Sequence, residues 1–255
     1  MKHIPNFITC LNLAAGFTSV IFASSGSLVV ASWLILAAMI FDFLDGFSAR
    51  LLHAYSEIGK ELDSLADIVS FGVSPAIIIH EMIKAAAGTG HGTSVFMSDV
   101  LPFVTILMPV LAGLRLAIFN VDSTQSAVFR GLPTPGNAIA VISIVLAAAY
   151  SRSPLIASFT ASPVALAIYS VTLSLLMVTR IPLISNKFKG FSFSGNEWRF
   201  IFAGAVLAML VIFGIASAPL IIPLYILMSL AAFYLPFSSP PSREDTSSRS
   251  TSKQP

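Results

Sequence analysis

Residues 28–47 read LVVASWLILAAMIFDFLDGF, a run in which Asp42 and Asp45 are the only charged side chains. A helix needs about 20 mostly apolar residues to cross the hydrocarbon core of a bilayer, so this stretch predicts a transmembrane helix. The rest of the chain is similar, because 56% of its 255 residues are hydrophobic and only 10% are charged, against about 25% charged in soluble domains. This composition excludes a soluble enzyme and predicts an all-α polytopic membrane protein, a bundle of about eight spans.

The predicted spans are apolar runs separated by short polar or Gly- and Pro-containing gaps. They cover residues 7–24, 28–47, 64–86, 98–119, 135–151, 161–180, 198–216 and 219–237. We therefore expect a membrane-embedded domain over residues 1–237 and a disordered cytoplasmic tail over residues 238–255, which are rich in Ser, Pro and Thr. In an alternative interpretation, residues 7–22 form the hydrophobic part of a signal peptide that is cleaved near Ala23 or Ser25.

The basic residues predict the orientation in the membrane. If the N-terminus faces the cytoplasm, all of the 14 Lys and Arg residues except Lys84 and Arg152 fall at or near the cytoplasmic side. We therefore expect an integral protein of the inner membrane with both termini in the cytoplasm. The single cysteine, Cys10, excludes an intrachain disulfide, and a net charge of +2 predicts no nucleic-acid partner.

Four of the 12 acidic residues lie in one short stretch of the chain. Asp42 and Asp45 end the second predicted span, and Asp63 and Asp67 begin the third. Spacings of three and four put each pair on one helix face, and a tight connection brings the pairs together at the cytoplasmic end of a helical hairpin. Helix capping is an alternative role for Asp63 and Asp67, but it does not suit two acids at the C-terminal end of a helix.

Such a cluster needs cations, because ionised carboxylates about 5 Å apart repel by roughly 3 kcal/mol per pair at an effective dielectric constant near 20. Hard divalent ions with oxygen ligands, Mg or Mn, are the natural partners, and two metals that share carboxylates are typical of phosphoryl transfer. Small residues and a forked cation lie between the acids: Gly46, Ala49, Arg50 and Gly59. Helix packing is the alternative explanation for the small residues.

The acids and the residues between them resemble the signature of the CDP-alcohol phosphatidyltransferase family at all eight fixed positions. These positions are Asp42, Asp45, Gly46, Ala49, Arg50, Gly59, Asp63 and Asp67. The resemblance implies an integral membrane enzyme that displaces CMP from a CDP-linked lipid with an alcohol. It also implies two divalent ions bound by the aspartates.

Further segments are similar to the phosphatidylserine synthase branch of this family: residues 5–12, 62–76, 115–120 and 131–135. The chain departs from that branch at Ile118, where a basic residue is common. The resemblance implies CDP-diacylglycerol, L-serine and membrane lipid as partners, with phosphatidylserine and CMP as products. Glycerol 3-phosphate or an inositol phosphate is the alternative acceptor, and a cation-coupled transporter is the alternative class, since intramembrane acids also mark ion pathways.

The resemblance also implies roles for individual residues. The metal pair is expected to be held or lined by Asp42, Asp45, Asp63 and Asp67, with Asp67 as the catalytic base. Contacts to the cytidine diphosphate are expected from Asp45, Gly46, Ala49, Arg50 and Gly59. The serine carboxylate or a lipid phosphate is expected to contact Arg115, Asn120 and Arg130; a topological role is the alternative for Arg130. Because the family is often dimeric, a homodimer is the expected assembly.

Overall fold

The structure is a computed structural model that describes residues 3–88, 96–121, 129–183 and 197–234. The described chain is helical apart from one pair of two-residue antiparallel strands, β1 (Phe129–Arg130) and β2 (Pro182–Leu183). The α-helices are α1 (His3–Ser24), α2 (Leu28–Leu51), α3 (Glu57–Asp67), α4 (Ser74–Gly88), α5 (Leu107–Val121), α6 (Thr134–Tyr150), α7 (Pro154–Thr160), α8 (Pro163–Val178), α9 (Glu197–Phe213) and α10 (Ile221–Tyr234). The π segments are η1 (Ile68–Val73) and η2 (Phe96–Val100), and the 3-10 segments are η3 (Leu101–Ile106) and η4 (Gly214–Leu220).

Several helical stretches are long and apolar enough to cross a membrane, as the composition predicts. Five meet this test in the described residues: 3–24, 28–51, 57–88, 96–121 and 197–234. The pair α7 and α8, bent by 85°, makes a sixth if it is counted as one span, and α6 is a shorter apolar helix. An all-α polytopic protein is therefore supported, and the number of eight spans stays a prediction.

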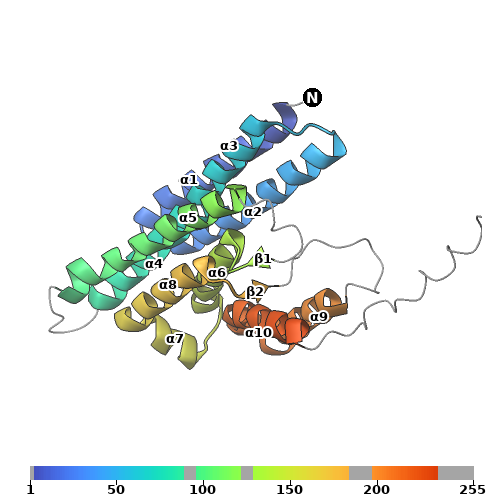
Figure 1. Ribbon diagram of the computed structural model, residues 1–255. Coiled ribbons are helices and arrows are strands. Elements are labelled where there is room, and N and C mark those ends of the chain that lie inside the picture. The colour runs from blue at the N-terminus through green and yellow to red at the C-terminus, as the bar shows by residue number, and fades with distance from the viewer. Residues whose placement is uncertain (1–2, 89–95, 122–128, 184–196, 235–255) are drawn as a thin grey trace, which may run out of the picture.

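The stretch from α9 to α10 folds back on itself. The rings of Phe202 and Tyr225 lie 5.6 Å apart, whereas a straight helix would separate these residues by about 35 Å. The turn lies in η4, where Gly214 has a φ of +64°, a conformation that glycine adopts without steric cost. Helices α9 and α10, which overlap the predicted spans 198–216 and 219–237, are thus the two arms of a helical hairpin, which lies at one side of the molecule (Figure 1).

Helices α1 to α5 form an elongated bundle, against which α6 and α8 pack (Figure 1). Small side chains let α1 approach its neighbouring helices closely, since Ala15, Gly16 and Ser19 are buried on α1. The Ser19 hydroxyl donates to the Ala31 carbonyl of α2 at 2.8 Å and accepts from the Ser74 hydroxyl of α4 at 2.6 Å. These bonds fix α1 between α2 and α4.

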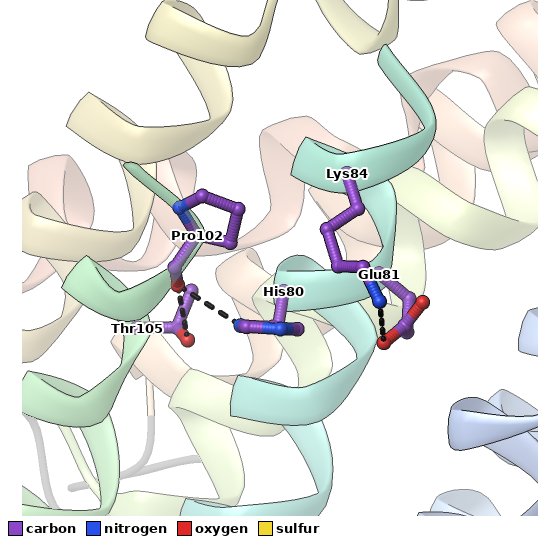
Figure 2. A network of polar contacts seen from close by, with 5 residues as sticks. All are labelled: His80, Glu81, Lys84, Pro102 and Thr105. Atoms are coloured by element: carbon purple, nitrogen blue, oxygen red, sulfur yellow. Dashed lines mark hydrogen bonds and ion pairs between the residues drawn. The ribbon is translucent and has the colours of Figure 1, made fainter. Parts of the chain in front are cut away.

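At the end of α4, its last turns are tied to η3 by a small polar network (Figure 2). His80 Nδ1 donates to the Pro102 carbonyl at 3.1 Å, and Thr105 Oγ1 donates to the same oxygen at 2.9 Å. On the same turns, Lys84 Nζ lies 3.3 Å from Glu81 Oε1. Lys84 and its counter-ion are therefore at the opposite end of the continuous helix 57–88 from Asp63.

Candidate active site

The four aspartates lie inside the continuous helical stretches 28–51 and 57–88, which extend beyond the spans predicted from hydropathy. Helix α2 continues to Leu51, and α3 begins at Glu57 after Ser56, whose hydroxyl accepts from the Gly59 amide at 3.0 Å. Asp63 and Asp67 are thus more than one turn past the helix start, so they do not cap it. The helices thus extend beyond the predicted spans 28–47 and 64–86, because hydropathy marks the apolar part of a helix and not its hydrogen-bonded ends.

The hairpin between α2 and α3 brings three of the aspartates into one group. One carboxylate oxygen from each of Asp42, Asp63 and Asp67 lies within 4.8 Å of the others. Asp45, one turn further along α2, is only 6% exposed. The chain reverses over residues 52–56, where His53 has a φ of +49°. This arrangement agrees with the clustering that the spacing predicted.

The acidic group has the features of a cation site. Asp45 Oδ2, Asp63 Oδ1 and Asp67 Oδ1 are buried and have no hydrogen-bond partner within the described residues. A buried polar oxygen without a partner is costly, and a divalent cation bound by several such oxygens removes that cost. The donors are all carboxylate oxygens, which suit hard ions such as Mg²⁺ or Mn²⁺. The aspartates therefore fit a divalent ion.

A cavity of ≈ 220 Å³ adjoins the acidic group. Its lining comes from α1, the end of α2, the connection and the start of α3: Pro5, Asn6, Thr9, Asp45, Gly46, Ala49, Arg50, Ala54, Tyr55, Ser56, Gly59, Lys60 and Asp63. All five residues predicted to contact the nucleotide are in this lining.

Two glycines in the lining show why small residues are needed there. A Cβ atom on Gly59 would lie 2.9 Å from Ser56 Oγ and 3.0 Å from Asn6 Oδ1, which is too close for normal packing. At Gly46 the nearest atom to such a Cβ is Arg50 Nη1, at 3.8 Å. Gly59 therefore allows α1 and α3 to meet, whereas Gly46 leaves open space in front of the arginine.

The three residues predicted for the acceptor are placed differently. Asn120 Nδ2 donates to Ser64 Oγ at 2.8 Å, so the end of α5 lies beside α3. Arg115 is buried and its Nη1 donates to the Met177 carbonyl at 2.9 Å. This contact ties α5 to the end of α8 and does not direct Arg115 into the cavity. Arg130 belongs to β1, and its side chain is outside the described part of the structure.

Some residues of the site were not assigned to it from the sequence. Lys60 lines the cavity, and its Nζ donates to the Asn120 carbonyl at 3.1 Å. The N-terminal turns of α1 supply a whole wall of the cavity, including Asn6 and Thr9. The spacing of three between Asn6 and Thr9 in an otherwise apolar helix could have indicated that this face of α1 lines a polar site.

The π segment η1 begins directly after Asp67 and is held by two buried side chains. Ser70 Oγ donates to the Asn12 carbonyl of α1 at 3.1 Å, and Asn137 Nδ2 of α6 donates to the Phe71 carbonyl at 3.0 Å. A π turn leaves backbone carbonyls without their usual α-helical partners and is frequent at functional sites. Here α1 and α6 fix the helix at the point where it carries Asp67.

The model of the CDP-alcohol phosphatidyltransferase family matches residues 2–178 of this chain, which include the acidic group and the cavity. The chain belongs to this family. It is similar to the CDP-diacylglycerol–serine O-phosphatidyltransferase of Mycobacterium leprae (strain TN), with 34% identity over 92% of this chain and 73% of the relative. The enzyme of the same name from Bacillus subtilis (strain 168) is 32% identical over 71% of this chain and 89% of the relative.

A third relative is the archaetidylserine synthase of Methanothermobacter thermautotrophicus (strain Delta H), 36% identical over 58% of this chain and 60% of the relative. The resemblance inferred from the eight motif residues is confirmed by these matches. The CDP-alcohol phosphatidyltransferase described here is accordingly a membrane-embedded transferase, and its acidic group and cavity lie within the region that defines the family.

Proposed function

We propose that this phosphatidyltransferase transfers the phosphatidyl group of CDP-diacylglycerol to the hydroxyl of L-serine, giving phosphatidylserine and CMP. The observation that carries the proposal is the cavity of ≈ 220 Å³ that opens beside the buried aspartates, with Arg50 in its wall. The names of the three relatives support serine as the acceptor. Two are named for CDP-diacylglycerol and the third for an archaeal lipid, but all three names include serine.

Two divalent ions, Mg²⁺ or Mn²⁺, are proposed to be held by Asp42, Asp45, Asp63 and Asp67. When bound, such ions neutralise the diphosphate and the charge that develops on the leaving CMP. The buried oxygens without hydrogen-bond partners on three of these aspartates support this assignment.

The remaining chemistry is assigned to side chains of the chain itself. Arg50 offers a forked set of N–H donors to a phosphate, and Gly46 leaves room in front of it. Asp67 accepts the proton of the serine hydroxyl. The serine oxygen then forms a bond to the phosphatidyl phosphorus while the bond from phosphorus to the CMP oxygen breaks, and CMP keeps the bonding electron pair. No covalent enzyme intermediate is needed.

For the serine carboxylate, Asn120 and Arg130 are the proposed contacts. The Asn120 side chain lies against Ser64 on α3, close to the acidic group. For Arg130 only the backbone is described. Arg115 is proposed to act indirectly, by holding α5 against α8.

The proposal places the site at the cytoplasmic end of the second and third of eight spans in the inner membrane, with both termini in the cytoplasm. Arg50 and Lys60 lie at the cavity, whereas Lys84 is paired with Glu81 at the other end of the 57–88 helix, and basic residues favour the cytoplasmic side. The domain over residues 1–237, the tail and the homodimer stay predictions.

An acceptor comparison tests the function. Purified protein receives CDP-diacylglycerol, Mg²⁺ or Mn²⁺, and L-serine, glycerol 3-phosphate or an inositol phosphate in separate reactions, and CMP and the lipid product are measured by mass spectrometry. An Asp63→Asn variant purified in parallel reports contaminating activity. We expect phosphatidylserine and CMP with L-serine. Product with glycerol 3-phosphate and none with serine would refute the acceptor, and no CMP with any alcohol would refute the transfer itself.

A further inference from the structure

Helix α1 buries three polar side chains, and for one of them the described residues provide no hydrogen bond of normal geometry. Thr9 Oγ1 donates to the Pro5 carbonyl at 3.0 Å, and Ser19 is bonded to both α2 and α4. Asn12 is 0% exposed, yet neither its Nδ2 nor its Oδ1 makes a hydrogen bond within the described residues. Burying an amide without a hydrogen bond costs roughly 1–3 kcal/mol on the scale of protein mutations. Thr9 and Ser19 are therefore satisfied within the helix bundle, whereas the Asn12 carboxamide still requires a polar partner.

The position of Asn12 relative to the acidic group is fixed by backbone contacts. Its carbonyl oxygen accepts the hydrogen bond from Ser70 Oγ at 3.1 Å. One turn further along α1, Gly16 lies so close to Ser70 that a Cβ atom on the glycine would overlap the serine hydroxyl. Helix α1 can thus neither slide nor move away from η1 at this level without breaking these contacts.

This contact places the Asn12 carboxamide next to Asp67. Ser70 follows Asp67 by three residues in the same continuous helical stretch, and the Asn12 side chain is near enough to the Asp67 carboxyl to interact with it. Asp67 Oδ1 is itself buried without a hydrogen-bond partner in the described residues. A carboxamide has N–H donors and no charge, so it can support a carboxylate without competing with a cation.

We propose that Asn12 is a positioning residue of the divalent-ion site, and that its Nδ2–H donates to the Asp67 carboxylate and orients it toward the ion. The proposal rests on the proposed function, because it requires that Asp67 bind a divalent ion. It adds a residue from α1 to a site whose family motif lies entirely between residues 42 and 67. Hydrogen bonds that orient ligating carboxylates are typically worth about 10–100-fold in metal affinity.

The test measures metal binding and does not depend on turnover. Mn²⁺ is titrated calorimetrically into the purified wild type, Asn12→Leu and Asn12→Ala, and the melting temperature is recorded without metal. Both variants remove the N–H donor, and neither adds a side chain that could bind the ion. Ser19→Ala is the matched control, since it removes buried hydrogen bonds from α1 two turns away from Asn12.

We expect both Asn12 variants to bind Mn²⁺ about 10–100-fold more weakly than the wild type, while Ser19→Ala binds like the wild type even if its melting temperature falls. Unchanged affinity in Asn12→Leu would overturn the proposal. If Asn12→Leu does not fold, Asn12→Ala decides the matter, because it also removes the N–H donor: wild-type Mn²⁺ affinity in that variant would overturn the proposal. A wild type that binds no Mn²⁺ would instead refute the ion site of the proposed function.

Discussion

Gly16 offers a quantitative test of the contact between α1 and η1. A Cβ atom on this residue would lie 2.7 Å from Ser70 Cα, whereas carbon atoms in normal contact are about 3.5–4.0 Å apart. A Gly16→Ala substitution must therefore push the two helices apart by roughly 1 Å. Because the obstructing atom belongs to the backbone, no change of side-chain rotamer relieves the overlap. We expect a loss of about 1–3 kcal/mol of stability, the usual cost of overpacking.

The same displacement is expected to reduce activity as well as stability. Ser70 is three residues after Asp67, so a shift of η1 moves the proposed base. A misplacement of about 1 Å in a catalytic group can cost about 100-fold in rate. Gly16→Ala should therefore melt at a lower temperature, remain folded at the assay temperature, and release CMP about 100-fold more slowly than the wild type.

A second glycine provides the matched control for this experiment. Gly204 lies within α9, and a Cβ atom there would meet no atom within 4 Å. Alanine is favoured over glycine inside a helix by about 0.5–1 kcal/mol, so Gly204→Ala should be at least as stable as the wild type and fully active. Wild-type melting temperature and CMP release in Gly16→Ala would refute the described packing of α1 on η1.

Three further predictions concern the site and its orientation. Asp67→Asn should lower kcat by about 100-fold or more with little change in binding of CDP-diacylglycerol, whereas Asp63→Asn should weaken the binding of metal and lipid as well; equal loss of binding in titrations of both variants would remove the separate role of Asp67. Arg50→Lys should raise KM for CDP-diacylglycerol, since a point charge replaces a forked donor; an unchanged KM would argue against a phosphate contact. In a cysteine-free background, a cysteine at position 90 should react with an impermeant thiol reagent outside intact cells and one at position 189 should not, and reversed labelling would overturn the orientation.

The acidic group could be predicted because its geometry depends on local spacing. Separations of three and four along a helix put two side chains on one face whatever the rest of the fold does. A short connection between two helices then leaves few ways to arrange Asp42, Asp63 and Asp67 other than the observed group. The apolar helices were predictable for a similar reason, because the length of an apolar run is a local property.

Features that depend on contacts between distant segments could not be predicted. The sequence shows that Arg115 is basic, but its direction toward the Met177 carbonyl depends on how α5 meets α8. The predicted span 161–180 corresponds to α8, but no helix was predicted over Pro154–Thr160, so α7 and its 85° bend from α8 were missed. The π turn after Asp67 is likewise invisible in the sequence, since it is held by Ser70 and Asn137 through bonds to other parts of the chain.

Asn12 shows where a local pattern stops being sufficient. Asn6, Thr9 and Asn12 are spaced by three in an apolar helix, so they predict a polar contact on one face, but not which helix supplies it. In the structure, Gly16 lets α1 pack against Ser70, and this contact places Asn12 beside Asp67. The family motif therefore contributes site residues from α2 and α3, and α1 contributes further ones. It follows that a substitution of Asn12 should alter ion binding in a protein whose motif residues are all unchanged.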